Sequence, residues 1–423
     1  MSEPAVADLA LAARRAARSL ASCGAEAKNA ALLAWAGALV EAAPEILEQN
    51  RADLEAARAA GTSEAVRDRL ALDIDRIAEM AASLRDVASL SDPIGDVLAR
   101  WTRPNGLRIR KVRVPFGVIG VIYEGRPNVT VDAAGLALKA GSAVLLRGSR
   151  VAERSNRALV RVLQSTGRAA GLPEGTVQAV PATRQSATDM MRARGLIDLL
   201  IPRGGADLIE TVVRESVVPV IETGVGNCHV YVDGAADLDK ALGILVNAKV
   251  QRPGVCNAAE TFLVHQAVAD RFLPVALAAL GRHGVEVYGD DAVVSASRSL
   301  GTGGAVVKPA TEAEYRAEFL DLRIAARVVG SLDEALDHIA EYGTRHTEAI
   351  VTEDPEAARR FTEEVDAAAV IVNASTRFTD GSEFGFGAEI GISTQKLHAR
   401  GPMALPELTT YKYVVEGDGQ VRD

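Results

Sequence analysis

Residues 116–123 have the sequence Phe-Gly-Val-Ile-Gly-Val-Ile-Tyr, and this stretch decides the fold. It is apolar throughout, without the alternation of polar and apolar side chains that marks a strand with one face in solvent. Continuous apolar strands are typical of parallel sheets that are covered on both faces. A loop over residues 124–128 and a helical pattern over 129–139, ended by Gly141, follow it. The stretch therefore predicts the first strand of a βαβ unit.

The same alternation continues along the first half of the chain. Strands are predicted over residues 143–146, 177–180 and 197–201, and helices over 153–170, 185–194 and 206–215. Alternation of this kind builds a parallel sheet with helices on both faces. Before it, residues 5–89 carry helical periodicity almost throughout.

A second series of strands and helices begins near Cys228. Strands are predicted over residues 229–232, 262–264, 285–288, 349–351 and 369–372, and helices over 238–249, 268–280, 332–342 and 355–365. Asp237 is the expected N-cap of the first of these helices. The series predicts a second α/β domain.

Length and charge narrow the class of protein. A chain of 423 residues is expected to hold two or three domains. Its net charge of −9 argues against nonspecific binding to nucleic acid or to an anionic membrane. No apolar run approaches the roughly 18 residues of a membrane span. We therefore expect neither a nucleic-acid partner nor a membrane.

The cysteines and histidines suggest no metal and no disulfide framework. Three cysteines are an odd number without a CxxC pair, and six histidines are scattered without an HExxH motif. This usage fits the reducing cytosol, so a cytoplasmic location is expected.

Residues 107–114 form a short basic segment in which arginine and lysine alternate with apolar side chains. Asn105-Gly106, a hairpin signal, precedes it. Two interpretations stay open on these residues alone: a solvated edge strand, or a strand at a contact between subunits.

Cys256 is the candidate nucleophile. Pro253 and Gly254 break the helical pattern before it, and a strand is predicted after it, so it lies on a loop between a helix and a strand. Reactive groups are often placed on such loops. Arg252, four residues upstream, would favour the thiolate over the thiol. The alternative is a small buried cysteine packed as a hydrophobic residue.

Two loops at the carboxyl ends of the first set of strands suit a dinucleotide. Arg147 and Ser149 offer a guanidinium and a hydroxyl to a ribose 2′-phosphate, although a plain surface charge is the alternative for Arg147. Gly204-Gly205 at a helix N-terminus permits close backbone approach. No GxGxxG motif is present, and Gly224-Val225-Gly226 lacks the third glycine. Any dinucleotide site is therefore built in another way.

Residues 250–265 resemble the active-site cysteine segment of the aldehyde dehydrogenase superfamily. Three further stretches, residues 123–130, 329–350 and 380–402, resemble the branch of that superfamily that reduces L-glutamyl 5-phosphate. The resemblance covers essentially the whole chain. It implies an α/β fold with two parallel-sheet domains and a small β-ribbon oligomerisation element.

Domain limits follow from the resemblance. It implies a cofactor-binding domain over residues 1–225, interrupted by a ribbon segment at 104–114. A catalytic domain is expected over 226–387, and a return segment with an oligomerisation strand over 388–423. Residues 107–114 and 409–416 fit the two separated segments of the ribbon, which favours the subunit contact.

The reaction that the resemblance implies is NADPH-dependent reduction of L-glutamyl 5-phosphate to L-glutamate 5-semialdehyde and phosphate, through a cysteine thioester, in proline biosynthesis. Oxidation of another small aldehyde with NAD or NADP remains the alternative. The expected partners are the small-molecule substrate, further copies of the chain in a dimer or tetramer, and glutamate 5-kinase in a transient contact.

Residue roles are carried over in the same way. Cys256 is the expected nucleophile, and Asn128, with the N–H of Cys256, the expected oxyanion donor. Glu222 resembles the water-activating glutamate of hydrolytic relatives, but hydrolysis would waste the activated substrate, so a structural or proton-transfer role is expected. Residues implied for the cofactor are Arg147, Ser149, Gly204, Gly205, Glu318 and Phe319.

The glutamyl head group carries an α-carboxylate and an α-ammonium, so it needs an arginine and an acceptor. The candidates for this group are Arg126, Arg345, His346, Ser375 and Arg377. No metal ligands are expected.

Overall fold

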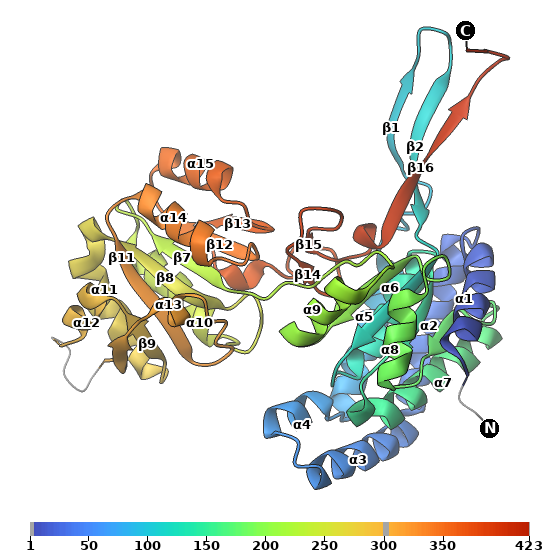
Figure 1. Ribbon diagram of the computed structural model, residues 1–423, viewed down its shortest axis with the longest axis horizontal. Coiled ribbons are helices and arrows are strands. Elements are labelled where there is room, and N and C mark those ends of the chain that lie inside the picture. The colour runs from blue at the N-terminus through green and yellow to red at the C-terminus, as the bar shows by residue number, and fades with distance from the viewer. Residues whose placement is uncertain (1–3, 299–303, 423) are drawn as a thin grey trace. The chain divides into compact units, whose positions relative to one another are not determined.

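The computed structural model describes residues 4–298 and 304–422, and the chain forms two compact units (Figure 1). The first unit consists of Met1–Thr223, Gly385–Gly391 and Met403–Asp423, and the second of Gly224–Phe384 and Ile392–Pro402. Each unit contains a parallel sheet and helices, which confirms the predicted fold class.

The first unit is built on a four-stranded parallel sheet with the order β5-β4-β3-β6. Its strands are β3 (Val118–Tyr123), β4 (Ala143–Arg147), β5 (Val177–Ala179) and β6 (Leu199–Arg203). All six residues of β3 are buried, as its continuous apolar sequence predicts. Val121 pairs with Leu146 on one side and Ile201 on the other. The loops after β3, β4 and β6 therefore meet at one edge of the sheet.

Helices surround this sheet. They are α1 (Val6–Leu20), α2 (Ala25–Glu41), α3 (Ala43–Ala59), α4 (Glu64–Leu70), α5 (Ile74–Ser89), α6 (Asn128–Lys139), α7 (Glu153–Ala169), α8 (Arg184–Arg192) and α9 (Ala206–Glu215), with a short 3-10 turn, η1 (Arg150–Ala152), before α7. Trp35 of α2 is fully buried and donates its ring N–H to the carbonyl of Leu163 in α7 at 2.8 Å. The helical character predicted for residues 5–89 is confirmed.

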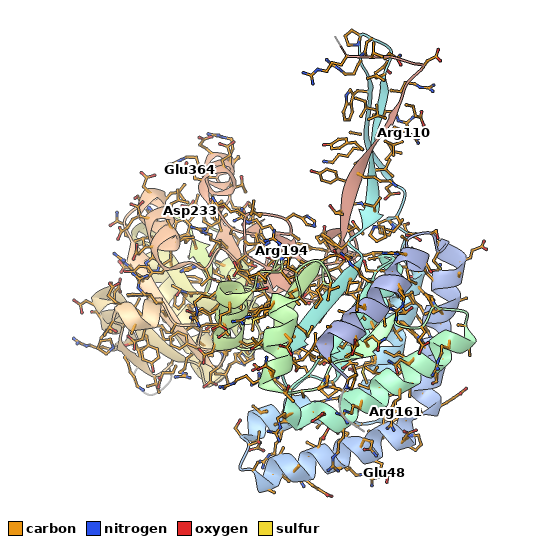
Figure 2. All side chains as sticks on the ribbon, turned by 45° about the vertical axis from the view of Figure 1, so that its right-hand side comes forward. Glu48, Arg110, Arg161, Arg194, Asp233 and Glu364 are labelled. Atoms are coloured by element: carbon orange, nitrogen blue, oxygen red, sulfur yellow. The ribbon has the colours of Figure 1, made fainter. Side chains whose placement is uncertain are left out.

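A three-stranded antiparallel ribbon belongs to the first unit and is drawn in Figure 1 as a narrow arm. It contains β1 (Val97–Thr102), β2 (Arg108–Pro115) and β16 (Thr409–Glu416). The predicted pairing of two distant segments is confirmed, with Arg110 opposite Val414. Arg110, labelled in Figure 2, contacts Glu416 at 2.7 Å. The sequence analysis missed β1, whose residues are all exposed and carry no burial pattern.

The second unit is built on a seven-stranded parallel sheet with the order β10-β9-β11-β8-β7-β12-β13. Its strands are β7 (Cys228–Val232), β8 (Ala259–His265), β9 (Glu286–Gly289), β10 (Val307–Pro309), β11 (Arg323–Val329), β12 (Thr347–Val351) and β13 (Ala369–Val372). The five predicted strands are present. Two were missed: β10 and β11, and β11 pairs with both β8 and β9 inside the sheet.

The four predicted helices of the second unit are present, and two short helices, α12 and α13, were missed. They are α10 (Leu238–Val250), α11 (Gln266–Arg282), α12 (Asp291–Arg298), α13 (Glu312–Tyr315), α14 (Leu332–Tyr342) and α15 (Pro355–Glu364). Asp237 accepts from the N–H groups of Asp239 and Lys240, which confirms it as the N-cap of α10. The turn η3 (Thr376–Phe378) and the short pair β14 (Ile392–Ser393) and β15 (Gly401–Pro402) also belong here, whereas the turn η4 (Pro406–Leu408) leads into β16 in the first unit.

Within residues 4–298 and 304–422, no single helix has the length and apolar composition of a membrane span. The bent pair α2 and α3 meets those two criteria only when its helices are taken together.

Candidate functional site

Cys256 lies on the loop that joins α10 to β8, as predicted. The helix ends at Val250, and Pro253 and Gly254 form a turn directly after it. Cys256 itself is partly exposed, whereas the next residue, Asn257, is buried. The loop thus keeps Cys256 partly accessible, whereas the residue that follows it is packed inside the unit.

Gly226 packs against the peptide group of Cys256. A Cβ at Gly226 would lie 1.6 Å from the carbonyl oxygen of Cys256, so only glycine permits this approach. The N–H of Gly226 donates to Oε1 of Glu318 at 2.7 Å. The sequence analysis treated this glycine only as part of an incomplete dinucleotide motif. In the structure, Gly226 contacts the backbone of the candidate nucleophile.

Cys228 lies beneath the same peptide group. Its thiol donates to the carbonyl oxygen of Cys256, with 3.2 Å between sulfur and oxygen. Burial raises the pKa of the Cys228 thiol well above its usual value, so the group stays protonated and remains a donor. No motif in the sequence indicated this contact. Two distant residues, Gly226 and Cys228, therefore fix the carbonyl of the candidate nucleophile.

A buried ion pair joins the helix before the Cys256 loop to the strand after it. Nζ of Lys249, on the last turn of α10, lies 2.6 Å from Oε2 of Glu260, on β8, and both side chains are 0% exposed. The other oxygen of Glu260 accepts from the N–H of Leu320. Burial raises the pKa of Glu260 to about 7 and lowers that of Lys249. The pair ties the two ends of the Cys256 loop together, and sequence spacing alone did not identify it.

Glu318 and Phe319 lie in the same unit as Cys256. The Glu318 carboxylate is held by the N–H of Gly226, which itself contacts Cys256. The Phe319 ring stacks on Tyr288, with 5.6 Å between ring centroids. The carboxylate expected at the nicotinamide ribose thus binds the backbone segment that contacts the candidate nucleophile.

Arg377 and Ser375 belong to the segment around η3. Oγ of Ser375 accepts from the N–H of Arg377 at 3.3 Å. Nε of Arg377 donates to Oε1 of Gln251 at 2.8 Å, and Nδ2 of Asn257 donates to the carbonyl of Thr379 at 2.9 Å. Side chains from both ends of the Cys256 loop therefore bind the η3 segment.

Arg345 and His346 occupy different surroundings. Arg345 has a positive φ of 63° and lies 3.8 Å from Asp366 at the surface. His346 is fully buried, with Nδ1 2.8 Å from Oγ1 of Thr347 and 3.7 Å from the sulfur of Cys228. His346 therefore contacts Cys228, the residue whose thiol binds the carbonyl of Cys256.

Asn128 begins α6 in the first unit, and the half-buried Arg126 precedes it in the loop after β3. Nδ2 of Asn128 donates to Oδ2 of Asp132, one helical turn onward, at 3.2 Å. Oδ1 of Asp132 accepts from the hydroxyl of Ser83 at 3.1 Å. Burial raises the pKa of Asp132 to about 6. The amide expected at the oxyanion is thus oriented by a carboxyl group that titrates in a mildly acidic range.

Arg147 and Ser149 follow β4, in the first unit. Nη2 of Arg147 donates to the carbonyls of Ala182 and Thr183 at 3.3 and 2.9 Å, while Nε is buried without a partner among the described residues. The hydroxyl of Ser149 accepts from the N–H of Gly125 at 3.1 Å. The orphaned Nε and the remaining hydroxyl capacity fit a phosphate-bearing ribose.

Gly204 and Gly205 precede α9, and Gly205 is its N-cap. The N–H of Gly205 donates to Oε2 of Glu124 at 3.0 Å, and a Cβ at Gly204 would lie 2.5 Å from the same oxygen. A carboxylate here stands where a dinucleotide phosphate is expected, which is consistent with an anion site at a helix N-terminus.

Residues 2–293 match the model of the aldehyde dehydrogenase family, and the chain belongs to that family. Within it, the chain is similar along its length to the gamma-glutamyl phosphate reductases of Moorella thermoacetica and Thermobifida fusca. Each is 58% identical over 411 residues, which cover 97% of this chain and 97% of the relative. The crystal structure of gamma-glutamyl phosphate reductase from Thermotoga maritima is 49% identical, with a TM-score of 0.95 over 99% of this chain and 100% of that one. The resemblance expected from the sequence is confirmed.

Proposed function

We propose that the chain catalyses the NADPH-dependent reduction of L-glutamyl 5-phosphate to L-glutamate 5-semialdehyde and phosphate, a step of proline biosynthesis. The observation that carries this proposal is identity of 58% to gamma-glutamyl phosphate reductases over 97% of the chain. The partly exposed cysteine on a tightly held loop supports it, because the reaction needs a nucleophile in a fixed position.

Cys256 is the proposed nucleophile. Its thiolate attacks C5 of the acyl phosphate, so the Sγ–C5 bond forms, the bond from C5 to the bridging oxygen breaks, and phosphate leaves with that electron pair. The hydride that reduces the resulting thioester is supplied by bound NADPH. The thiohemiacetal on Cys256 then releases the aldehyde and restores the thiolate.

Each tetrahedral species on Cys256 carries an oxyanion that needs donors. The proposed donors are the side-chain amide of Asn128 and the N–H of Cys256. One amide hydrogen of Asn128 is bound by Asp132, which leaves the other for the substrate.

The proposed cofactor contacts are the residues that the resemblance implies. Arg147 and Ser149 bind the 2′-phosphate and adenine ribose, because an arginine with an unused buried N–H suits a phosphate dianion. Gly204 and Gly205 approach the dinucleotide phosphates. Glu318 and Phe319, beside the Cys256 loop, bind the nicotinamide ribose.

The proposed contacts for the glutamyl head group are Arg126, Arg345 and Ser375. His346 is fully buried against Cys228, so we assign it the support of the Cys256 loop.

The ribbon is the proposed contact in a homo-oligomer. Trp101, Tyr413 and Val415 are 40%, 55% and 55% exposed on its strands. Burying large apolar side chains against a second copy is favourable. A transient contact with glutamate 5-kinase, which would pass on the labile acyl phosphate in the cytoplasm, is part of the same proposal.

An assay in the reverse direction tests the function. Purified protein is mixed with L-glutamate 5-semialdehyde and NADP⁺, with and without inorganic phosphate, and NADPH is followed by its absorbance. Strict dependence on phosphate is expected. Sustained NADPH formation without phosphate would refute the proposal and favour oxidation of an aldehyde to a carboxylate.

A further inference from the structure

Two arginines converge on the segment that carries Cys256. Arg252 is exposed and comes four residues before the cysteine. Arg377 is partly buried and comes from η3, beyond β13. Its Nε donates to Oε1 of Gln251, the neighbour of Arg252 in the chain. Its carbonyl accepts from Nδ2 of Asn257, the neighbour of Cys256. Arg377 thus contacts both sides of the loop that carries Arg252 and Cys256.

The charge of Arg252 acts directly on Arg377. Burial lowers the pKa of Arg377, the charge of Arg252 lowers it further, and the charges of Asp380, Cys256 and Glu383 raise it. Neither Arg252 nor Arg377 forms an ion pair with a carboxylate in the part of the chain that the structure describes. Two like charges are therefore held close together, and an anion bound between them would offset their repulsion.

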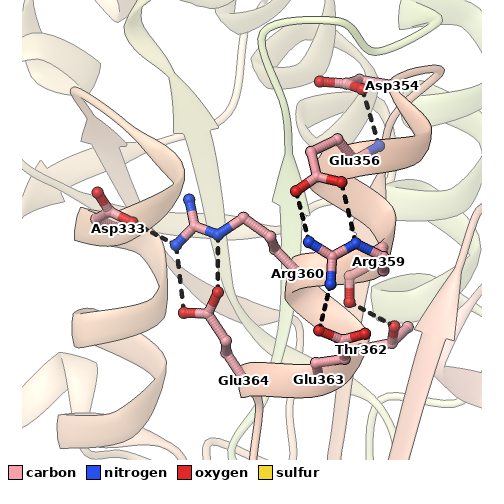
Figure 3. Close-up of polar contacts among 8 residues, drawn as sticks. All are labelled: Asp333, Asp354, Glu356, Arg359, Arg360, Thr362, Glu363 and Glu364. Carbon is pink, nitrogen blue, oxygen red and sulfur yellow. Dashed lines mark hydrogen bonds and ion pairs between the residues drawn. The ribbon is translucent and has the colours of Figure 1, made fainter.

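The arginines of α15, in the same unit, behave differently. Figure 3 shows that Arg359 and Arg360 each bind two carboxylates: those of Glu356 and Glu363, and those of Glu364 and Asp333. These two surface arginines are thus paired within the chain. Arg377, by contrast, is partly buried and donates to the neutral side chain of Gln251.

The chemistry of the substrate decides which anion this pair meets. In L-glutamyl 5-phosphate the phosphate is joined to C5 through one oxygen, whereas the α-carboxylate is separated from C5 by C4, C3 and C2. C5 must reach Sγ of Cys256, so charges close to that sulfur face the phosphate. We propose that Arg252 and Arg377 form the subsite for the phosphate of the substrate.

This inference rests on the proposed function and changes one assignment. Arg377, expected from sequence at the glutamyl head group, moves to the leaving group. The guanidinium fork binds two phosphate oxygens and offsets the negative charge that grows as the bond from C5 to oxygen breaks. In the reverse direction the pair holds inorganic phosphate while its oxygen attacks the thioester, forming the C5–O bond and releasing Sγ.

The test measures the reverse reaction with inorganic phosphate as the probe. Arg377→Gln and Arg252→Gln are each expected to raise the KM for phosphate by about tenfold or more, the loss of one charge-assisted contact. The KM for L-glutamate 5-semialdehyde should stay within about twofold of wild type, since no contact with the head group is removed. Arg377→Lys keeps the positive charge but loses the two-pronged guanidinium group. Its KM for phosphate should therefore lie between that of wild type and that of Arg377→Gln. Arg359→Gln, which removes the same charge from α15, should change neither constant.

Different failures are distinguishable. An unchanged KM for phosphate together with a raised KM for the semialdehyde would overturn the inference and return the arginines to the α-carboxylate. If Arg377→Gln does not fold, the exposed Arg252→Gln decides by the same two constants. A wild-type enzyme that needs no phosphate would instead refute the proposed function.

Discussion

Replacing Lys249 by methionine is expected to destabilise the second unit strongly. Lys249 and Glu260 are 2.6 Å apart and both are 0% exposed, so the replacement leaves a carboxylate in the interior without its partner. Loss of one partner of a buried ion pair costs about 3–5 kcal/mol. For a unit of this size the corresponding fall in Tm is on the order of 10 °C. Thermal and urea unfolding of the full chain, followed by circular dichroism, measure it.

The destabilisation should grow with pH. Burial already raises the pKa of Glu260 to about 7, and removal of the Lys249 charge raises it further. A carboxyl whose pKa is higher in the folded than in the unfolded state contributes stability at low pH, and that contribution is lost as pH rises through the folded value. Lys249→Met should therefore lose less stability at pH 6, where Glu260 takes up a proton, than at pH 8.5.

A double replacement separates the pair from its surroundings. Lys249→Met with Glu260→Gln removes both charges and should recover much of the stability that Lys249→Met loses, giving a coupling of about 2–3 kcal/mol at pH 8.5. Lys240→Met is the control, because Lys240 and Glu353 form a 2.8 Å pair in which each side chain is 53% exposed. A Lys249→Met protein that unfolds at pH 8.5 like this control would refute the reasoning.

Three further predictions concern single side chains. Cys256 should react with a limiting alkylating agent faster than Cys23 and Cys228, as peptide mapping would show; equal labelling of all three would contradict an activated thiolate. Arg147→Ala should raise the KM for NADPH by about tenfold and leave that for NADH nearly unchanged, and an unaltered ratio would move the 2′-phosphate contact elsewhere. Because the pKa of Asp132 is raised to about 6, the stability that this group contributes is present below pH 4 and is lost as pH rises through 6. In Asp132→Asn the free energy of unfolding should therefore fall less between pH 4 and 7 than in wild type. Urea unfolding at several pH values measures it, and the same fall in both proteins would contradict the prediction.

Elements with a clear burial pattern were predictable from the sequence. The apolar run that became β3 has the composition of a strand covered on both faces, and it is buried at every position. The loop of Cys256 was marked by Pro253, which cannot continue a regular helix, and by Gly254, which disfavours one. In both places the residues of one short segment are enough to predict its structure, because the fold places that segment in the environment its composition favours.

Strands with mixed composition were not predictable. β11 carries arginines at positions 323 and 327, so its sequence lacks the continuous apolar run of its neighbours, although it lies inside the sheet. β1 is exposed along its whole length, and it is a strand because β2 pairs with it. Propensity and periodicity describe one segment at a time, whereas pairing depends on a partner elsewhere in the chain.

The supports of the candidate nucleophile escaped sequence analysis for the same reason. Cys228 lies far from Cys256 in the chain, and its thiol meets the carbonyl of that residue only in the folded unit. Lys249 and Glu260 are close in sequence, but their burial depends on the sheet and helices that cover them. The sequence therefore indicated the candidate nucleophile, and the structure was needed to identify the groups that hold its backbone.

Gly226 offers the sharpest test that these supports matter for chemistry. A Cβ added there would lie 1.6 Å from the carbonyl oxygen of Cys256, a backbone atom that moves only with the whole loop. Displacement of a reacting group by about an ångström can reduce the rate a hundredfold, so Gly226→Ala is expected to lose about that much activity. Gly243→Ala is the matched control: Gly243 is an exposed glycine in α10 with no atom within 4 Å of the new Cβ, and the replacement should leave activity unchanged and raise stability by about 0.5–1 kcal/mol. A Gly226→Ala protein with wild-type activity would mean that the position of the Cys256 peptide does not limit the reaction.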